Sequence, residues 1–124
     1  MARIISVSYD DTLLRTREWM LTAAGHSVIS AEGFHDAREA CERPKYDLFV
    51  LGHSIPENDK IELIECFRRA SPNGKVIALT RAGERRLKQV DAYISPGDPE
   101  ELVRLVKILS EPEADRRSGL RRIK

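Results

Sequence analysis

The sequence lacks several features that would define a function by themselves. The apolar run at its N-terminus is short and is interrupted by Asp10 and Asp11, which excludes a signal peptide or membrane span there. Its two cysteines, Cys41 and Cys66, form no CxxC pair, so no metal or redox spacing is present. No GxGxxG or GxxxxGK[ST] phosphate loop occurs. We expect a cytoplasmic protein with buried, reduced cysteines and no metal or cofactor.

An excess of charge of one sign is also missing. The chain has 21 basic and 20 acidic residues, so no global field favours nucleic acid, a membrane or an acidic substrate. Its 124 residues, 41% of them hydrophobic, are enough for a single core. One compact domain is expected, and any partner has to be inferred from local features.

Short apolar segments alternate along the chain with segments of helical spacing, as in βα units that build a parallel sheet. The expected strands span residues 3–8, 26–30, 46–51, 75–79 and 92–94. The first helix is expected to end at Gly25, and the next two span roughly 34–42 and 59–70. The last begins after Asp98, with Pro99 in its first turn and Glu101 completing a capping box.

Two of these helices carry an apolar stripe at helical spacing. In the first helix the stripe consists of Leu13, Thr16, Met20, Leu21 and Ala24, and in the last of Leu102, Leu105, Val106 and Leu109. The segment between Thr80 and Ala92 is short and polar, so the fourth helix is expected to be a stub or a loop.

This pattern predicts an α/β fold, a three-layer flavodoxin-like (βα)5 sandwich. Its central five-stranded parallel sheet has the order 2-1-3-4-5, with a shortened helix four. The domain is expected to span 1–110, followed by a basic, disordered C-terminal tail at 111–124. In such folds ligands bind outside the carboxyl ends of the strands. Residues that directly follow a strand are therefore the candidate site.

The candidate site residues are Ser8, Tyr9 and Asp10 at the end of the first strand, Gly52 and His53 after the third, Thr80 and Arg81 after the fourth, and Ser95 after the fifth. The span 3–109, and within it the segment YDLFVLGHSIPENDKIEL, resembles the receiver domains of response regulators, the CheY-like superfamily. The resemblance places the phosphoacceptor aspartate on Gly52, the magnesium-binding acidic pair on Ser8 and Tyr9, and the conserved lysine of that family on Ser95. Of the family's site residues only the hydroxyl residue after the fourth strand is retained, as Thr80.

These departures predict a pseudo-receiver in, or derived from, two-component phosphorelay signalling. An acyl phosphate needs a carboxylate nucleophile, and Mg²⁺ needs several oxygen ligands, but Asp10 alone offers one carboxylate. We expect no phosphoacceptor, no catalytic residue and no bound metal. Lys60 replaces the family's turn glycine, which indicates an altered loop. The bond matching Ser95–Pro96 is usually cis in the family, so a cis bond here would indicate a retained backbone.

Three residues keep two interpretations each. Arg81 either fills the vacated pocket and pairs with Asp10, or points into solvent. His53 either acts as a base or ligand group, or is a loop histidine bonded to backbone. Trp19, off the first helix's stripe, either anchors a partner or packs against a neighbouring helix.

The leading hypothesis is therefore a domain that acts by phosphorylation-independent protein–protein interaction, with a signalling protein as its partner and no enzyme activity. The alternative is a small-ligand or anion-binding module, or a weak enzyme, that uses Ser8, Asp10, His53 and Thr80. Nucleic acid is an unlikely partner, through the basic tail alone. No membrane contact is expected, and the sequence indicates no oligomeric state.

Overall fold

The protein was analysed as a computed structural model that describes residues 1–81, 83–84 and 86–110. Strands and helices alternate along this part of the chain, except that the fourth strand is followed directly by the fifth. The elements are β1 (Arg3–Ser8), α1 (Asp11–Ala23), β2 (Ser27–Glu32), α2 (Gly33–Cys41), β3 (Leu48–Leu51), α3 (Glu57–Ala70), β4 (Lys75–Leu79), β5 (Ala92–Ile94) and α4 (Pro99–Ser110).

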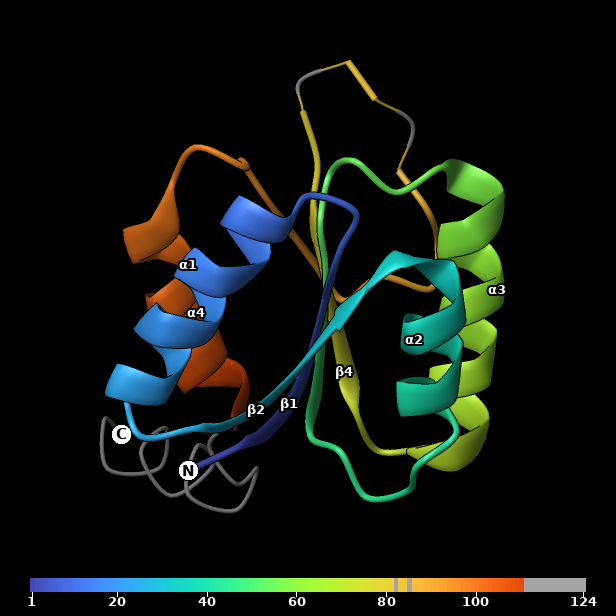
Figure 1. The fold of residues 1–124 in the computed structure, drawn as a ribbon, viewed down its shortest axis with the longest axis horizontal. Helices are drawn as coiled ribbons and strands as arrows, with labels where there is room; N and C mark the ends of the chain where they lie inside the picture. Colours follow the sequence, from blue (N-terminus) through green and yellow to red (C-terminus); the bar gives the residue numbers. More distant parts are fainter. Residues whose placement is uncertain (82, 85, 111–124) are drawn as a thin grey trace, which may run out of the picture.

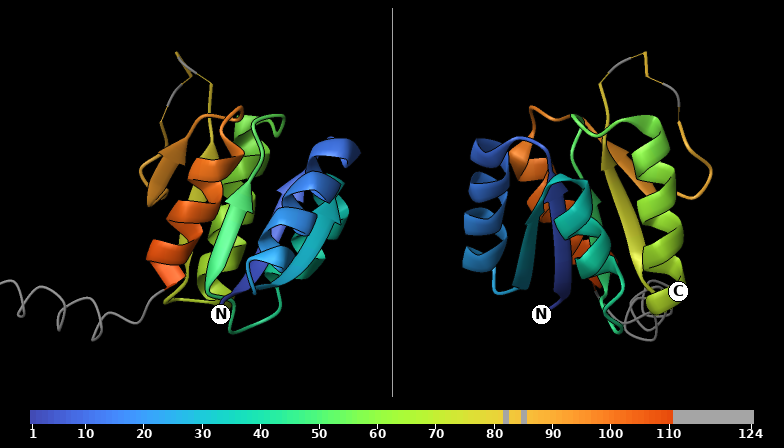
Figure 2. Two further views of the ribbon diagram at one scale, coloured as in Figure 1. Left: turned by 90° about the vertical axis from the view of Figure 1, so that its left-hand side faces the viewer. Right: turned by 45° about the vertical axis from the view of Figure 1, so that its right-hand side comes forward.

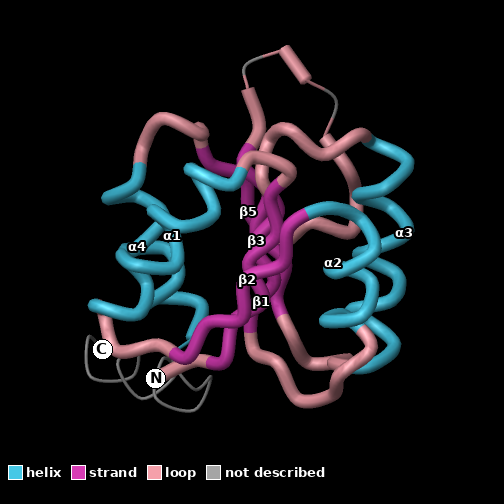
Figure 3. Tube along the Cα trace, in the orientation of Figure 1, coloured by secondary structure: helices cyan, strands magenta, loops and turns pink. Residues whose placement is uncertain are grey.

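The five strands form one parallel sheet in the order β2-β1-β3-β4-β5, with helices in a layer on each side (Figures 1 and 3). Helices α1 and α4 cover one face, and α2 and α3 cover the other (Figure 2). Each face has its own buried apolar cluster, because successive side chains of a strand point to opposite faces. The three-layer (βα)5 fold and its strand order are confirmed.

Helix α1 buries a different stripe from the expected one. Asp10 caps the helix by accepting the N–H of Leu13 at 3.1 Å. The residues it buries are Leu14, Arg17 and Leu21, so of the expected stripe only Leu21 is buried. Two neighbouring faces have apolar residues at helical spacing, and contact with the sheet selects the one that includes an arginine. The expected stripe was therefore wrong.

Helix α4 begins as expected, but its capping box is only half formed. Asp98 Oδ1 accepts the N–H of Glu101 at 3.0 Å. The Glu101 carboxylate instead binds Arg104, and the Asp98 N–H donates to Ser95 O at 3.2 Å. An exposed arginine one turn along outcompetes the backbone for this carboxylate. The expected stripe is confirmed, with Leu102 and Val106 fully buried and Leu105 and Leu109 packed beside them.

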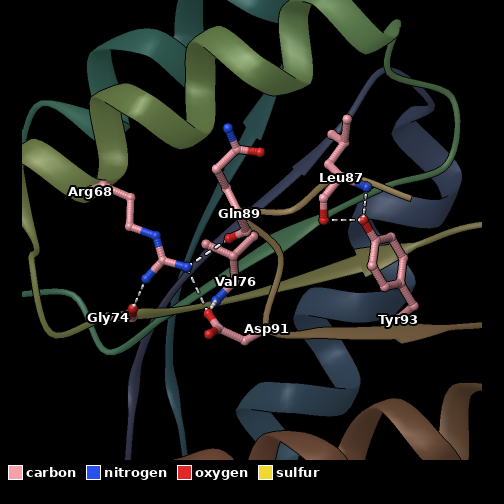
Figure 4. A network of polar contacts seen from close by, with 7 residues as sticks. All are labelled: Arg68, Gly74, Val76, Leu87, Gln89, Asp91 and Tyr93. Atoms are coloured by element: carbon pink, nitrogen blue, oxygen red, sulfur yellow. Dashed lines mark hydrogen bonds and ion pairs between the residues drawn. The ribbon is translucent and has the colours of Figure 1, made fainter. Parts of the chain in front are cut away.

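The connection between β4 and β5 contains no helix in its described residues, as expected. Arg68 of α3 holds this connection to the sheet (Figure 4). Its guanidinium donates to Gly74 O at 2.7 Å, to Gln89 O at 2.7 Å and to Asp91 Oδ2 at 2.8 Å. A second anchor is the Tyr93 hydroxyl, which is hydrogen-bonded to both the N–H and the carbonyl of Leu87. Side-chain bonds thus hold a segment that has no helix to order it.

The element boundaries and the two cysteines agree with the expectations in part. Strands β2 and β3 and helices α2 and α3 are shifted by one or two residues at one or both ends. In the strands, ladder pairing such as Ser8 with Glu32 fixes the ends. Cys41 and Cys66 are free and buried, and burial raises the pKa of Cys41 to about 12, so its thiol stays protonated. No described helix is long and apolar enough to cross a membrane. The expected tail at 111–124 lies outside the described residues.

Candidate functional site

The carboxyl ends of β1 and β3 lie side by side and form the centre of the candidate site. Gly52 donates its N–H to Val7 O at 2.9 Å, which continues the ladder beyond β3. Ser8 is fully buried, and its hydroxyl oxygen accepts the N–H of Asp10 at 3.0 Å. The loop after β1 also touches the loop after β3, since the Tyr9 N–H donates to Ser54 Oγ at 3.3 Å.

The space beside Gly52 is occupied by a side chain that the sequence analysis did not select. A Cβ atom placed on Gly52 would lie 3.0 Å from Nη1 of Arg17, 3.2 Å from Val7 O and 3.3 Å from Ser8 Oγ. These separations are shorter than ordinary van der Waals contact. Arg17 therefore extends from α1 to the strand end and lies where a side chain at position 52 would begin.

Arg17 is the most unusual group of the site. Only 5% of its surface is exposed, and neither Nη1 nor Nη2 has a hydrogen-bond partner. Burial lowers the pKa of Arg17, and the nearby charge of Asp10 partly opposes this. A guanidinium in this setting carries a large desolvation cost, because its donors have lost water without gaining an acceptor.

The two residues that follow Ser8 are engaged elsewhere. The Tyr9 hydroxyl donates to Asp59 Oδ2 on α3 at 2.8 Å, and burial together with this bond raises the pKa of Tyr9. Asp10 is exposed and caps α1. In the described chain, metal-binding side chains approach one another in a group of three only on the exposed surface of α2, at His35, Asp36 and Glu39.

The ends of β4 and β5 form a separate part of the site. Thr80 and Ser95 line a shallow cavity of about 300 Å³ together with Arg81. Arg81 is exposed, and its backbone N–H donates to Glu84 Oε1 at 3.3 Å. Of its two interpretations the solvent-facing one is confirmed, and pairing with Asp10 was wrong, because Arg81 is exposed and forms no ion pair with Asp10 in the described residues.

His53 fits neither of its interpretations fully. Its Nδ1 is buried and has no hydrogen-bond partner, so the expected bond to backbone is absent at this atom. Burial lowers the pKa of His53, and the positive charges of Arg81 and Arg17 lower it further. The imidazole is thus neutral at neutral pH, without the hydrogen-bond partner at Nδ1 that would orient it as a base.

Lys60, which the sequence analysis linked to an altered loop after β3, lies in a helix. Helix α3 already begins at Glu57, so Lys60 lies in its first turn and not in a tight turn. Its buried side chain reaches a cavity of about 210 Å³, where Nζ lies 3.9 Å from Glu84 Oε2. The Ser95–Pro96 bond is trans, so the cis bond usual in that family is not present.

The structure decides against one of the two interpretations of Trp19. Its side chain is 74% exposed on α1, so it does not pack against a neighbouring helix.

The sequence analysis missed Arg17, although one signal for its burial was available. It lies three residues after Leu14 and four before Leu21, which is the spacing of an inward stripe, but a charged side chain is rarely assigned to such a position.

Comparisons with known proteins agree with this architecture. No family model matches the chain. The transcriptional regulatory proteins GlrR of Escherichia coli K12 and QseF of Escherichia coli O157:H7 are each 30% identical to it over 82 residues. The match covers 66% of this chain but 18% of each relative, so the chain spans less than a fifth of their length.

Solved receiver domains match almost the whole chain. A CheY-like response regulator receiver domain protein from Methanospirillum hungatei JF-1 is 26% identical, with a TM-score of 0.76, and the match covers 93% of this chain and 98% of that one. The response regulator TrrA, in a complex with the histidine kinase ThkA, is 24% identical with a TM-score of 0.73. That match covers 90% of this chain and 100% of TrrA's.

The fold is thus of the doubly wound α/β class. Over almost its whole described length the chain is similar to the CheY-like response regulator receiver domains, and over 82 residues to the regulatory proteins GlrR and QseF.

Proposed function

We propose that this receiver domain signals without aspartyl phosphorylation, through contact with a protein partner. The observation that carries the proposal is the arrangement at Gly52, the position that follows β3. Glycine offers no nucleophile, and the adjoining space is filled by the Arg17 guanidinium 3.0 Å from the point where a Cβ would lie. A cation of the protein takes the place that phosphorylation chemistry would need.

The neighbouring residues support the same conclusion. An acyl phosphate forms on a carboxylate, and Mg²⁺ has to be held by several oxygen ligands while it forms. Ser8 is fully buried, the Tyr9 hydroxyl is bound to Asp59, and the Asp10 carboxylate caps α1. Thr80, Arg81 and Ser95 lie beside a different cavity.

We assign Ser8, Tyr9, Asp10, Gly52, His53, Thr80, Arg81 and Ser95 to a remnant site without a catalytic role. Hydrolysis by a serine and His53 is not favoured, because Nδ1 of His53 has no partner to orient it and no hydrogen bond joins Ser8 to His53 in the described residues.

The decisive experiment is incubation with acetyl phosphate and Mg²⁺, followed by intact-mass measurement. We expect no adduct of about 80 Da, the increment of one phosphoryl group, while a phosphorylatable receiver treated in parallel gains it. The Gly52→Asp variant is expected to remain unmodified too, because its new carboxylate would meet Arg17 and no acidic pair. A stable adduct on the wild-type chain would refute the proposal.

For the partner, the complex of TrrA with the histidine kinase ThkA suggests a signalling protein of the same system. Trp19 is the most exposed large aromatic of the described surface, and aromatic side chains dominate interface energetics. We expect Trp19→Ala to weaken binding to the purified cognate kinase at least about tenfold. His35→Ala, an exposed change on α2 in the opposite layer, serves as the matched control.

We further propose that residues 1–110 form the domain, that 111–124 are a basic tail, and that the protein acts in the cytoplasm. Truncation after Ser110 should leave the melting temperature unchanged. If the full chain binds DNA weakly, that binding should disappear on truncation and decrease steeply with salt. DNA binding that survives both changes would contradict this division of the chain.

A further inference from the structure

Two buried polar groups at the carboxyl ends of the strands have no hydrogen-bond partner. They are the guanidinium of Arg17, through both Nη1 and Nη2, and the imidazole of His53, through Nδ1. Unpartnered buried polar atoms are rare in folded proteins, and each of them indicates strain, a function or a missing acceptor. Here the Arg17 group is 95% buried and still a cation, so the missing group is best supplied by an anion.

The geometry around Gly52 shows where such a group would be held. Nη1 of Arg17 and the Ser8 oxygen lie 3.0 and 3.3 Å from the point where a Cβ of Gly52 would stand. The Ser8 oxygen already accepts the Asp10 N–H, so its own hydroxyl proton can be donated. Glycine at position 52 is needed for this arrangement, because any side chain there would press on the guanidinium.

The acidic residues near this position are occupied. Asp10 acts on Arg17 through its charge, but its carboxylate accepts the N–H of Leu13 as the cap of α1. Glu84 accepts the N–H of Arg81 and lies 3.9 Å from Lys60 Nζ. Neither carboxylate satisfies the two free Nη groups of Arg17.

We propose that this end of the sheet binds a small oxyanion noncovalently and without a metal, with the Arg17 guanidinium as the principal donor. The two Nη groups form a planar fork that matches two oxygens of a phosphate or carboxylate. The Ser8 hydroxyl lies beside the fork and donates a further bond. Because Arg17 is 95% buried, we expect anion entry to require a local opening of this strand end.

This inference is separate from the proposed signalling role. Binding of inorganic phosphate here forms no covalent bond and needs no Mg²⁺, so it can be present whether or not the chain accepts a phosphoryl group. The phosphodonor experiment and the binding experiment therefore fail independently.

The test measures thermal unfolding in increasing inorganic phosphate with EDTA, against chloride at matched ionic strength. We expect the melting temperature of the wild-type chain to rise with phosphate, since a ligand of the folded state stabilises it by mass action. Arg17→Leu should abolish the rise, and Arg15→Leu, an exposed arginine on the same helix, should retain it. Acetate in place of phosphate distinguishes a carboxylate site from a tetrahedral oxyanion site.

Arg17→Lys provides a second variant, should Arg17→Leu fail to fold. It keeps the charge but loses the fork, and we expect at least about tenfold weaker phosphate binding by isothermal titration calorimetry. The proposal is overturned by a phosphate effect no larger than that of chloride, or by equal effects on the wild type and on the Arg17 variants. Either result would mean that water alone solvates the guanidinium.

Discussion

Replacing Arg17 with leucine should stabilise this protein, although the substitution is made at a buried position. In the structure the guanidinium is 95% buried and its two terminal nitrogens have no partner. Leucine continues the buried stripe that already contains Leu14 and Leu21. The change therefore removes a desolvated charge and keeps an apolar contact with the sheet.

The magnitude follows from two opposing effects. Removal of a poorly compensated buried charge in favour of an apolar side chain is worth about 1–4 kcal/mol in favourable cases. Leucine is shorter than arginine, so a small void beside Gly52 costs part of that gain, on the order of 1 kcal/mol. We expect a net increase of up to about 3 kcal/mol in the free energy of unfolding.

Urea unfolding in a buffer without oxyanions measures this directly. With a slope of about 1.5 kcal/mol per molar urea, the midpoint should rise by up to roughly 2 M. Arg15→Leu is the matched control, since that side chain is 81% exposed and forms a surface ion pair with Asp11. Its effect should stay within about 0.5 kcal/mol.

A destabilisation of Arg17→Leu by more than about 1 kcal/mol would refute the reasoning. It would show that the guanidinium has an acceptor in solution, strong enough to outweigh the cost of burying the charge. An unchanged midpoint together with a changed slope would instead indicate an altered unfolded state.

Three further predictions concern other parts of the structure. Arg68→Met should lower the free energy of unfolding by about 2 kcal/mol, because three acceptors lose their donor. If the loss is local, amide hydrogen exchange should accelerate most between β4 and β5. Gly52→Ala should lower the free energy of unfolding by about 1 kcal/mol, and by less in the Arg17→Leu background. A double-mutant cycle that shows no coupling energy would exclude contact between the two positions. Stability should be level near pH 7.5 and fall as the pH drops below the ordinary histidine pKa of about 6.5. Burial lowers the folded-state pKa of His26 and of His53, so the unfolded chain binds protons first as the pH falls. Urea midpoints that stay level from pH 7.5 to 5 would contradict this.

Most of the fold could be predicted from the pattern of residues. Consecutive apolar residues in 75–79 and the alternation of strand and helix segments indicated a buried parallel sheet, and Asp98 with Pro99 marked the start of α4. These features are local, because each depends on residues within a turn or two of one another. The missing helix between β4 and β5 was likewise visible as a short polar segment.

The arrangement of the site was only partly predictable. Residues after the strands could be grouped because parallel strands end at one edge of a sheet, and Ser8, Asp10 and Gly52 do lie together. The positions of the basic residues in the sequence do not show which of their side chains reaches that edge of the sheet. Arg81 is adjacent in sequence to a strand end but faces solvent, whereas Arg17 reaches the edge from the middle of α1.

The sequence by itself determined the class of fold, the order of its elements and the absence of a carboxylate at the end of β3. Tertiary structure alone decided which face of α1 meets the sheet, and with it the burial of Arg17 against Gly52. The physical reason is that helical spacing allows two neighbouring faces to be nearly equally apolar. Only packing against the whole sheet and α4 selects between them, even where the selected face includes a charge.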